Sequence, residues 1–125
     1  MAASGLVDVL AHVDVIKVAG HRAPRLAEIE ARLVDGLVLM SPVIEFSSAG
    51  LRKPVDDTYP SGHLLDQLLE AGLDVTTASD AHVVDQIGAN FDVLATQLDA
   101  RGVTELVSFR RRNPVRYGRE PLAGR

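Results

Sequence analysis

Short apolar runs alternate along this chain with stretches that have the periodicity of a helix. An almost continuous apolar run covers residues 6–13, as in buried parallel strands, and leucine and isoleucine then recur at helical spacing over residues 26–36. The later part of residues 37–46 predicts a second strand. Ser61, a good N-cap, comes directly before a leucine-rich stretch that predicts a second helix.

The same alternation continues in the second half of the chain. Residues 74–77 are short and β-branched and predict a third strand, apolar residues at helical spacing follow over 87–98, and residues 104–109 predict a fourth strand. Strands that alternate with helices are typical of parallel βαβ units, so the predicted fold class is α/β. A closed barrel needs about eight such units and ~250 residues. The chain holds half of that at most, as a small open sheet or as part of a larger barrel.

Composition adds limits to this picture. The chain has 125 residues, 46% of them hydrophobic, and no cysteine, which indicates one small domain without disulfides. Asp8 and Asp14 interrupt the only apolar stretch near the N-terminus, so no membrane span is expected. We therefore expect a cytoplasmic protein that does not contact a membrane.

Charge is distributed unevenly along the chain. Residues 1–109 contain seven basic and sixteen acidic side chains, whereas residues 110–125 contain six arginines and one glutamate. An acidic body argues against a nucleic-acid surface. The basic end is typical of a solvated terminus.

Polar side chains come in pairs where three predicted strands end. The pairs are His12 and Asp14, Glu45 and Ser47, and Asp80 and His82. Carboxyl ends of parallel strands meet at one edge of a sheet, where α/β proteins collect the groups used in chemistry. Because side chains alternate along a strand, His12 and Asp14 would point the same way if the first strand continued that far.

Carboxylate and imidazole groups are the ligands that Zn²⁺, Mn²⁺ or Fe²⁺ would take at such an edge. Each pair by itself is equally typical of a polar strand end followed by a loop or a helix cap. Three pairs at successive strand ends favour a site, but composition and spacing leave both interpretations open.

Four motifs in this order resemble the C-terminal half of phosphoesterases of the PHP superfamily, of the histidinol-phosphatase type. They are VLAHVD at 9–14, EFSSAGLRKP at 45–54, YPS at 59–61 and SDAH at 79–82. The resemblance extends from about Val7 to Arg111. It implies a distorted, TIM-like barrel of seven βα units, of which this chain would supply three to four, with divalent metals at its C-terminal mouth. Residues 1–111 would then be a partial PHP domain and residues 112–125 a basic tail.

The resemblance also implies roles for individual residues. His12, Asp80 and His82 match metal ligands, Glu45 matches a residue that lines the mouth, and Lys17 and Arg52 match cations that hold the substrate phosphate. A forked donor such as Arg52 suits phosphate on physical grounds too. The implied substrate is a phosphorylated small molecule, with histidinol phosphate suggested by the family alone.

The chain departs from the family pattern before His12. The family begins with a His-x-His strand and adds further His and Glu ligands, whereas His21 and His63 are the only other histidines here. We expect His63 to face solvent in the first turn of a helix. For His21 we favour a position away from the mouth of the implied barrel. Each metal would then receive a single protein ligand, which is too few to bind it.

Three hypotheses follow from these observations. The first is a metal-dependent phosphomonoester hydrolase of the PHP type, present as an incomplete portion and inactive alone. The second is a non-catalytic α/β module, a decayed relative that binds a phosphorylated ligand or a partner chain. The third treats the resemblance as accidental and the chain as an open-sheet binding domain. Unpaired strand edges would favour self-association in any of them.

Overall fold

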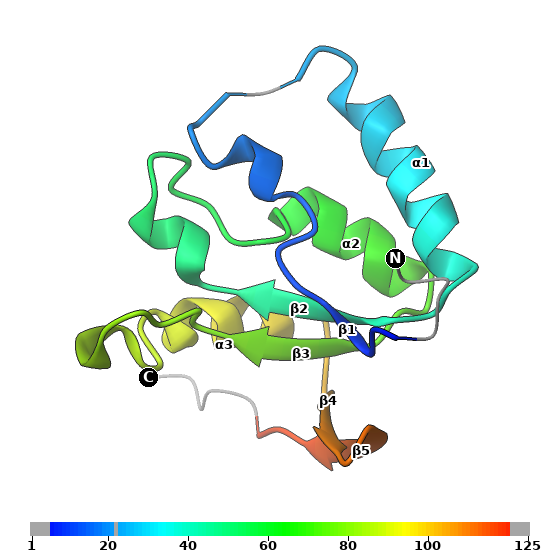
Figure 1. Ribbon diagram of the computed structural model, residues 1–125, viewed down its shortest axis with the longest axis vertical. Helices are drawn as coiled ribbons and strands as arrows, with labels where there is room; N and C mark the ends of the chain where they lie inside the picture. The colour runs from blue at the N-terminus through cyan, green and yellow to red at the C-terminus, as the bar shows by residue number, and fades with distance from the viewer. Residues whose placement is uncertain (1–5, 22, 121–125) are drawn as a thin grey trace.

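A three-stranded parallel sheet lies at the centre of the computed structural model, which describes residues 6–21 and 23–120. Its strands are β1 (Val9–Leu10), β2 (Val43–Ser47) and β3 (Val75–Ala78), in the order β1-β2-β3. The parallel register places Ile44 opposite Val75 and Ser47 opposite Ala78. The three strands therefore end at the same edge of the sheet (Figure 1).

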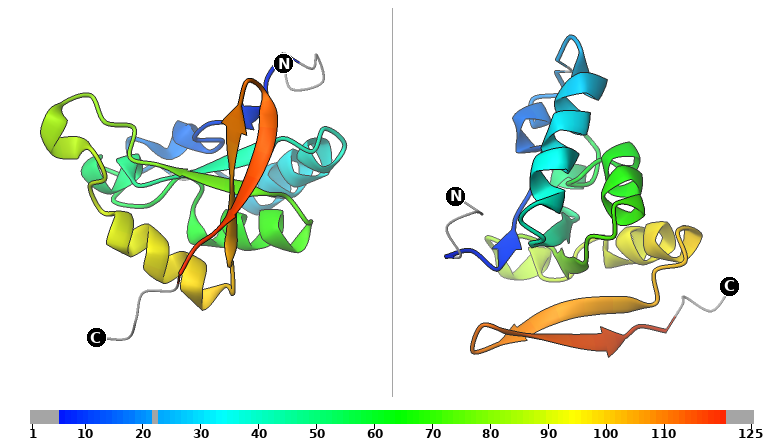
Figure 2. Two further views of the ribbon diagram at one scale, coloured as in Figure 1. Left: turned by 90° about the horizontal axis from the view of Figure 1, so that it is seen from below. Right: turned by 90° about the vertical axis from the view of Figure 1, so that its right-hand side faces the viewer.

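Three α-helices connect and cover these strands. They are α1 (Leu26–Val38), α2 (Gly62–Glu70) and α3 (Phe91–Ala100). α1 and α2 lie on one side of the sheet, as the two views of Figure 2 show. Short 3₁₀ helices follow the strand ends: η2 (Val15–Lys17) after β1, η3 (Ala49–Arg52) after β2 and η4 (Val84–Gln86) after β3. The predicted α/β class is confirmed.

The hydrophobic core forms where β2 and β3 meet α2 and α3. Ile44 and Phe46, two apart on β2, are both fully buried, as the alternation of side chains along a strand requires. They pack in one cluster with the leucines of the two helices, which are Leu64, Leu65, Leu68, Leu94 and Leu98. Ser61 caps α2 as predicted, because its side-chain oxygen accepts a hydrogen bond from the backbone N–H of Leu64.

The first strand is shorter than the sequence predicts. The apolar run 6–13 forms only the two residues of β1, and both are half-buried. The chain leaves the strand direction at His12, which has a φ of 33°, and no strand pairs with the outer edge of β1 within the described part of the chain. His12 and Asp14 are therefore not two positions of one continuous strand.

The predicted fourth strand forms, but it does not join the parallel sheet. β4 (Glu105–Arg110) forms an antiparallel hairpin with β5 (Asn113–Gly118), separate from the parallel sheet. Arg111 and Arg112 in the turn have φ values of 52° and 66°, as in a two-residue hairpin turn. The Gly or Asn that usually signals such a turn is missing, which is why the sequence did not predict it.

Three arginines of the basic end attach this hairpin to the body. Arg112 pairs with Asp8 at 2.8 Å, Arg116 with Asp74 at 2.5 Å and Arg119 with Asp99 at 2.6 Å. The hairpin crosses the sheet on the side away from α1 and α2 (Figure 2). Residues 113–118 are thus a strand with exposed side chains rather than the expected tail; residues 121–125 of that tail lie outside the described residues.

No helix within the described ranges is both long and apolar enough to cross a membrane.

Candidate functional site at the strand ends

His12, Glu45 and Asp80 come together at the edge where the three parallel strands end. Burial is the main cause that raises the pKa of Glu45, and the negative charge of Asp80 raises it further. The charge of His12 and a hydrogen bond from its backbone lower that pKa. Residues from the ends of the two neighbouring strands, His12 and Asp80, therefore act on the carboxyl group of Glu45. Oε1 of Glu45 is buried and has no hydrogen-bond partner among the described residues.

His82 lies on the exposed loop that follows β3. Its ring Nδ1 is 2.9 Å from the carbonyl oxygen of Asp80. A carbonyl can only accept, so Nδ1 carries the proton and donates, which leaves the lone pair of Nε2 free for a ligand in the neutral ring. The backbone N–H of His82 donates to Oε1 of Gln86 at 3.0 Å, a contact that the sequence did not suggest.

The predicted ligands do not form a complete metal site. Within residues 6–21 and 23–120, no group of three or more His, Asp or Glu side chains is placed to hold a metal ion. The imidazole nitrogens and the carboxylate are nevertheless suitable single donors. Each of these side chains could therefore act as one ligand of a divalent metal, but together they do not form a full coordination sphere.

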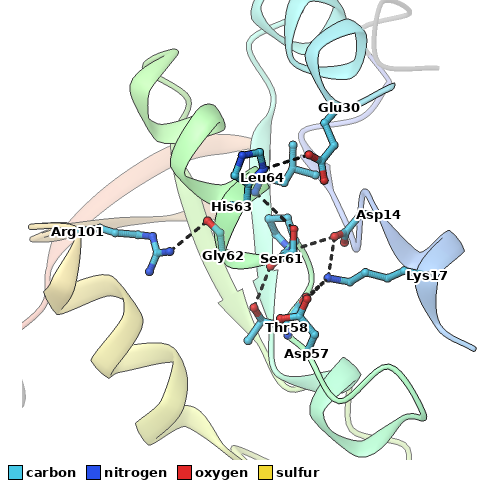
Figure 3. A network of polar contacts seen from close by, with 11 residues as sticks. Asp14, Lys17, Glu30, Asp57, Thr58, Ser61, Gly62, His63, Leu64 and Arg101 are labelled. Atoms are coloured by element: carbon cyan, nitrogen blue, oxygen red, sulfur yellow. Dashed lines mark hydrogen bonds and ion pairs between the residues drawn. The ribbon is translucent and has the colours of Figure 1, made fainter. Parts of the chain in front are cut away.

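Lys17 is surrounded by oxygen atoms of this chain (Figure 3). Its ammonium group lies 2.6 Å from Oδ2 of Asp57, 2.9 Å from Oδ2 of Asp14 and 2.8 Å from the carbonyl oxygen of Thr58. It also lies 5.5 Å from the centre of the Tyr59 ring. An ammonium has three donors, and three oxygen atoms already take them. A phosphate would have to displace one of these oxygens.

Asp14 connects the end of β1 to the start of α2. Its Oδ2 accepts a hydrogen bond of 2.8 Å from the backbone N–H of Ser61 in addition to the contact with Lys17 (Figure 3). Its other oxygen is buried and has no partner in the described ranges. Burial, followed by the negative charges of Asp14 and Asp57, raises the pKa of Tyr59. Asp14 thus has a structural role in this network.

Arg52 reaches from η3 to the end of β3. Its Nη2 donates to the carbonyl oxygen of Ser79 at 2.6 Å and lies 3.5 Å from that of Asp80. Its Nη1 is buried, with no hydrogen-bond partner in the structure as described. Arg52 therefore contacts the segment that carries Asp80 and His82, which the sequence pattern did not indicate.

The remaining predicted residues are Ser47, His63 and His21. Ser47 is fully buried and its side chain accepts from the backbone N–H of Ala49. His63 faces solvent in the first turn of α2, as predicted, and its Nδ1 lies 3.1 Å from Oε2 of Glu30. His21 is exposed and lines a groove of about 710 Å³ between η2, α1 and the start of α2. Neither histidine is among the groups that act on Glu45.

Sequence reasoning missed two residues that complete these contacts. Asp57 and Tyr59 enclose Lys17, yet the sequence pattern assigns Asp57 no role and names Tyr59 only as part of the YPS motif. The signal available was the acidic pair Asp56-Asp57 directly before the motif that contains Tyr59-Pro60.

Comparison with curated proteins identifies relatives of this chain. Over 116 residues it is 35% identical to a Deinococcus radiodurans protein named "Probable histidinol-phosphatase", a match that covers 89% of this chain and 42% of the relative. A Schizosaccharomyces pombe protein of the same name is 29% identical over 79 residues, which cover 63% of this chain and 26% of that protein. No family model matches the chain.

The chain is therefore similar in sequence to proteins named as probable histidinol-phosphatases. This confirms the resemblance that the four motifs carry, and the hypothesis that the resemblance is accidental is wrong. The chain spans less than half the length of the two relatives.

Proposed function

We propose that this chain carries part of the active site of a metal-dependent phosphomonoester hydrolase of the histidinol-phosphatase type. The observation that carries the proposal is the meeting of His12, Glu45 and Asp80 at one edge of a parallel sheet, in a relative of proteins named for that activity. The proposed substrate is a phosphorylated small molecule, and the proposed location is the cytoplasm, without a nucleic-acid partner.

His12, Asp80 and His82 would each donate to a divalent metal, Zn²⁺, Mn²⁺ or Fe²⁺, in the complete enzyme. Such a metal would make bound water a nucleophile near neutral pH. The ring of His82 is prepared for this role, because Nδ1 donates to the Asp80 carbonyl and Nε2 stays available. Glu45 would line the same mouth as a buried carboxyl group.

The two predicted phosphate cations differ in what they can offer. Arg52 keeps a buried Nη1 without a hydrogen-bond partner in the described structure, so we assign the phosphate contact to Arg52 first. All three donors of Lys17 contact oxygen atoms of the chain. Lys17 would bind phosphate only if the substrate replaced one of them.

We further propose that β1, β2 and β3 are successive strands of a TIM-like, seven-unit PHP barrel, with residues 1–111 as its partial domain. The outer edge of β1 carries no strand within the described residues. Leu6 before β1 and Ile16 after it are 77% and 80% exposed. In the complete barrel further strands would cover this edge, and alone the chain would be inactive and prone to self-association through it.

A chimera tests the proposal. Residues of this chain replace the matched residues of the Deinococcus radiodurans relative, and release of phosphate from histidinol phosphate is measured with added Mn²⁺. We expect activity in the chimera, a loss of about 100-fold or more with Asp80→Ala, and none in the 125-residue chain alone. A chimera that folds but hydrolyses no phosphomonoester would contradict the proposal.

A non-catalytic α/β module is the alternative function. One observation favours it: no complete metal-binding group forms in the described ranges. In that case the folded chimera would be inactive, and phosphate or a phosphorylated ligand would still bind the chain in a calorimetric titration and lose affinity with Arg52→Met.

A further inference from the structure

The segment that carries Asp80 and His82 depends on contacts from a neighbouring strand end. Residues 79–90, which we call the β3 loop, expose their larger apolar side chains, with Val84 80% and Ile87 73% exposed. Few apolar contacts therefore hold the β3 loop in place. Its polar anchors come from the turn after β2: the hydroxyl of Ser48 donates to the carbonyl oxygen of Ala89 at 2.6 Å, and Arg52 donates to that of Ser79.

The backbone at Asp80 needs such an anchor. Asp80 has a φ of 48°, in the left-handed region, which costs a residue with a Cβ about 1 kcal/mol or more. This conformation aims the carbonyl oxygen of Asp80 at two groups, the ring Nδ1 of His82 at 2.9 Å and Nη2 of Arg52 at 3.5 Å. One oxygen atom thus connects the guanidinium to the imidazole.

We propose that Arg52 is a positioning residue for Asp80 and His82, in addition to any contact with phosphate. Its guanidinium holds the carbonyl oxygens of two successive residues, Ser79 and Asp80. This fixes the turn that carries the Asp80 carboxylate and the His82 ring, and so keeps Nδ1 of that ring at the carbonyl oxygen of Asp80. The functional importance of this role rests on the proposed function, whereas the role itself concerns this chain alone.

The chemistry of the contact explains why arginine fits here. A planar guanidinium presents several donors in a fixed fork, so one side chain can serve two neighbouring acceptors. A lysine ammonium is a point charge on a flexible stem and would hold at most the nearer oxygen, that of Ser79. Lysine at position 52 should therefore position these carbonyl oxygens in part, and methionine should not position them at all.

The protonation site of the His82 ring tests the proposal directly. Long-range ¹H–¹⁵N spectra of the full chain distinguish a protonated from an unprotonated ring nitrogen. In the unchanged chain at a fixed, slightly alkaline pH we expect one dominant tautomer, with the proton on Nδ1 of His82. Arg52→Met should give a mixture of both tautomers, and Arg52→Lys an intermediate spectrum.

Arg101 offers a matched control. It also donates to two backbone carbonyl oxygens, at 3.0 Å from Gln97 and 3.1 Å from Gly62, and it pairs with Asp66. It lies directly after α3, at the end of that helix opposite the β3 loop. Arg101→Met should leave the His82 tautomer unchanged even if it lowers stability. An unchanged tautomer in Arg52→Met, or an equal change in Arg101→Met, would overturn the proposal.

Metal binding separates this proposal from the proposed function. Mn²⁺ is added to the folded chimera described above, and paramagnetic broadening of the His82 ring signals is followed. Tautomer control by Arg52 without any broadening would support the positioning role and contradict the metal role. Broadening in the chimera, together with a tautomer that does not depend on Arg52, would support the metal role and contradict the positioning role.

Discussion

The turn after β1 and the turn after β2 each present one cation near the end of the sheet, and the two cations behave differently. Lys17 is held by two carboxylates and one carbonyl oxygen, and only 16% of its side chain is exposed. Arg52 donates only to backbone carbonyl oxygens and retains a buried donor that no described residue satisfies. The sequence assigned both residues the same role.

The difference shows that the role of a cation depends on residues that are distant in the sequence. Asp57 lies 40 positions after Lys17 and Ser79 lies 27 positions after Arg52. The turn after β1 therefore has a stabilising ion-pair network, whereas the turn after β2 supports the β3 loop. Substitutions in the two turns should separate stability from site geometry.

The largest effect is expected where η3, in the turn after β2, packs against residues 57–59, which hold Lys17. Gly50 lies in η3 beside Arg52, and a Cβ there would overlap the backbone oxygen of Asp57, the partner of Lys17, and lie 3.0 Å from Cζ of Tyr59. Backbone atoms cannot move aside cheaply, so Gly50→Ala should lower the free energy of unfolding by about 3 kcal/mol or more, measured by urea denaturation.

Gly36→Ala is the matched control. Gly36 lies inside α1, and a Cβ there would meet nothing within 4 Å. Alanine should stabilise the helix by about 0.5 to 1 kcal/mol. Equal effects of the two substitutions would show that η3 is not packed against Asp57 and Tyr59.

A smaller loss is expected from Lys17→Met. Methionine keeps much of the apolar stem but leaves Asp14 and Asp57 without their cation, and Asp14 is only 12% exposed. Loss of one partner from a largely buried pair should cost about 2 to 4 kcal/mol. Urea denaturation in the absence of phosphate measures this change in the free energy of unfolding.

Arg25→Met provides the comparison for Lys17. Arg25 pairs with Glu28 on the surface, at 2.9 Å between Nε and Oε1, and 75% of its side chain is exposed. Because both side chains are solvated, that pair should contribute little to stability, and Arg25→Met should be much milder than Lys17→Met. If Lys17→Met were as mild as Arg25→Met and weakened only phosphate binding, Lys17 would be a substrate ligand and the contrast with Arg52 would disappear.

The smallest effect is a dependence on pH at Glu45, which lies between the two turns. Because its pKa is raised in the folded chain, the folded state binds more protons than the unfolded state at pH values just above the ordinary pKa of Glu. Stability contributed by the protonated form is then lost as the pH rises through this window. Because glutamine does not ionise, Glu45→Gln should remove this loss of stability at higher pH.

We therefore expect the free energy of unfolding of Glu45→Gln, relative to that of the unchanged chain, to be higher at about pH 8 than at about pH 4. Glu70→Gln, on the exposed side of α2, controls for the loss of one carboxylate. A gain that does not grow with pH would mean that Glu45 is well solvated and not enclosed between His12 and Asp80.

Much of the fold is predictable from local patterns. The helix after Ser61 and the strands that form β2 and β3 are predicted within a few residues, because capping, periodicity and β-branching act locally. The extent of β1 and the pairing of β4 are not predictable in this way. Within the described residues β1 has no strand on its outer edge, and β4 pairs with β5 through a turn made of two arginines.

The candidate site is predictable in part, because local patterns predict the strands at whose ends it lies. Strand ends meet because the strands are parallel, so the neighbourhood of His12, Glu45 and Asp80 follows from the βαβ pattern. The partners of Lys17 and Arg52 come from residues 57–58 and 79–80, in loops whose paths no periodicity indicates. Both ligand roles and phosphate contacts therefore need the three-dimensional structure to be assigned.

The metal content of the purified 125-residue chain tests the central claim most directly, because it assumes no substrate. After incubation with Zn²⁺ or Mn²⁺ and gel filtration, native mass spectrometry should show no bound metal in the unchanged chain, since His12, Asp80 and His82 do not complete a coordination sphere. The chimera should retain metal, and lose it with Asp80→Ala. One equivalent retained by the isolated chain and lost with Asp80→Ala would contradict the account.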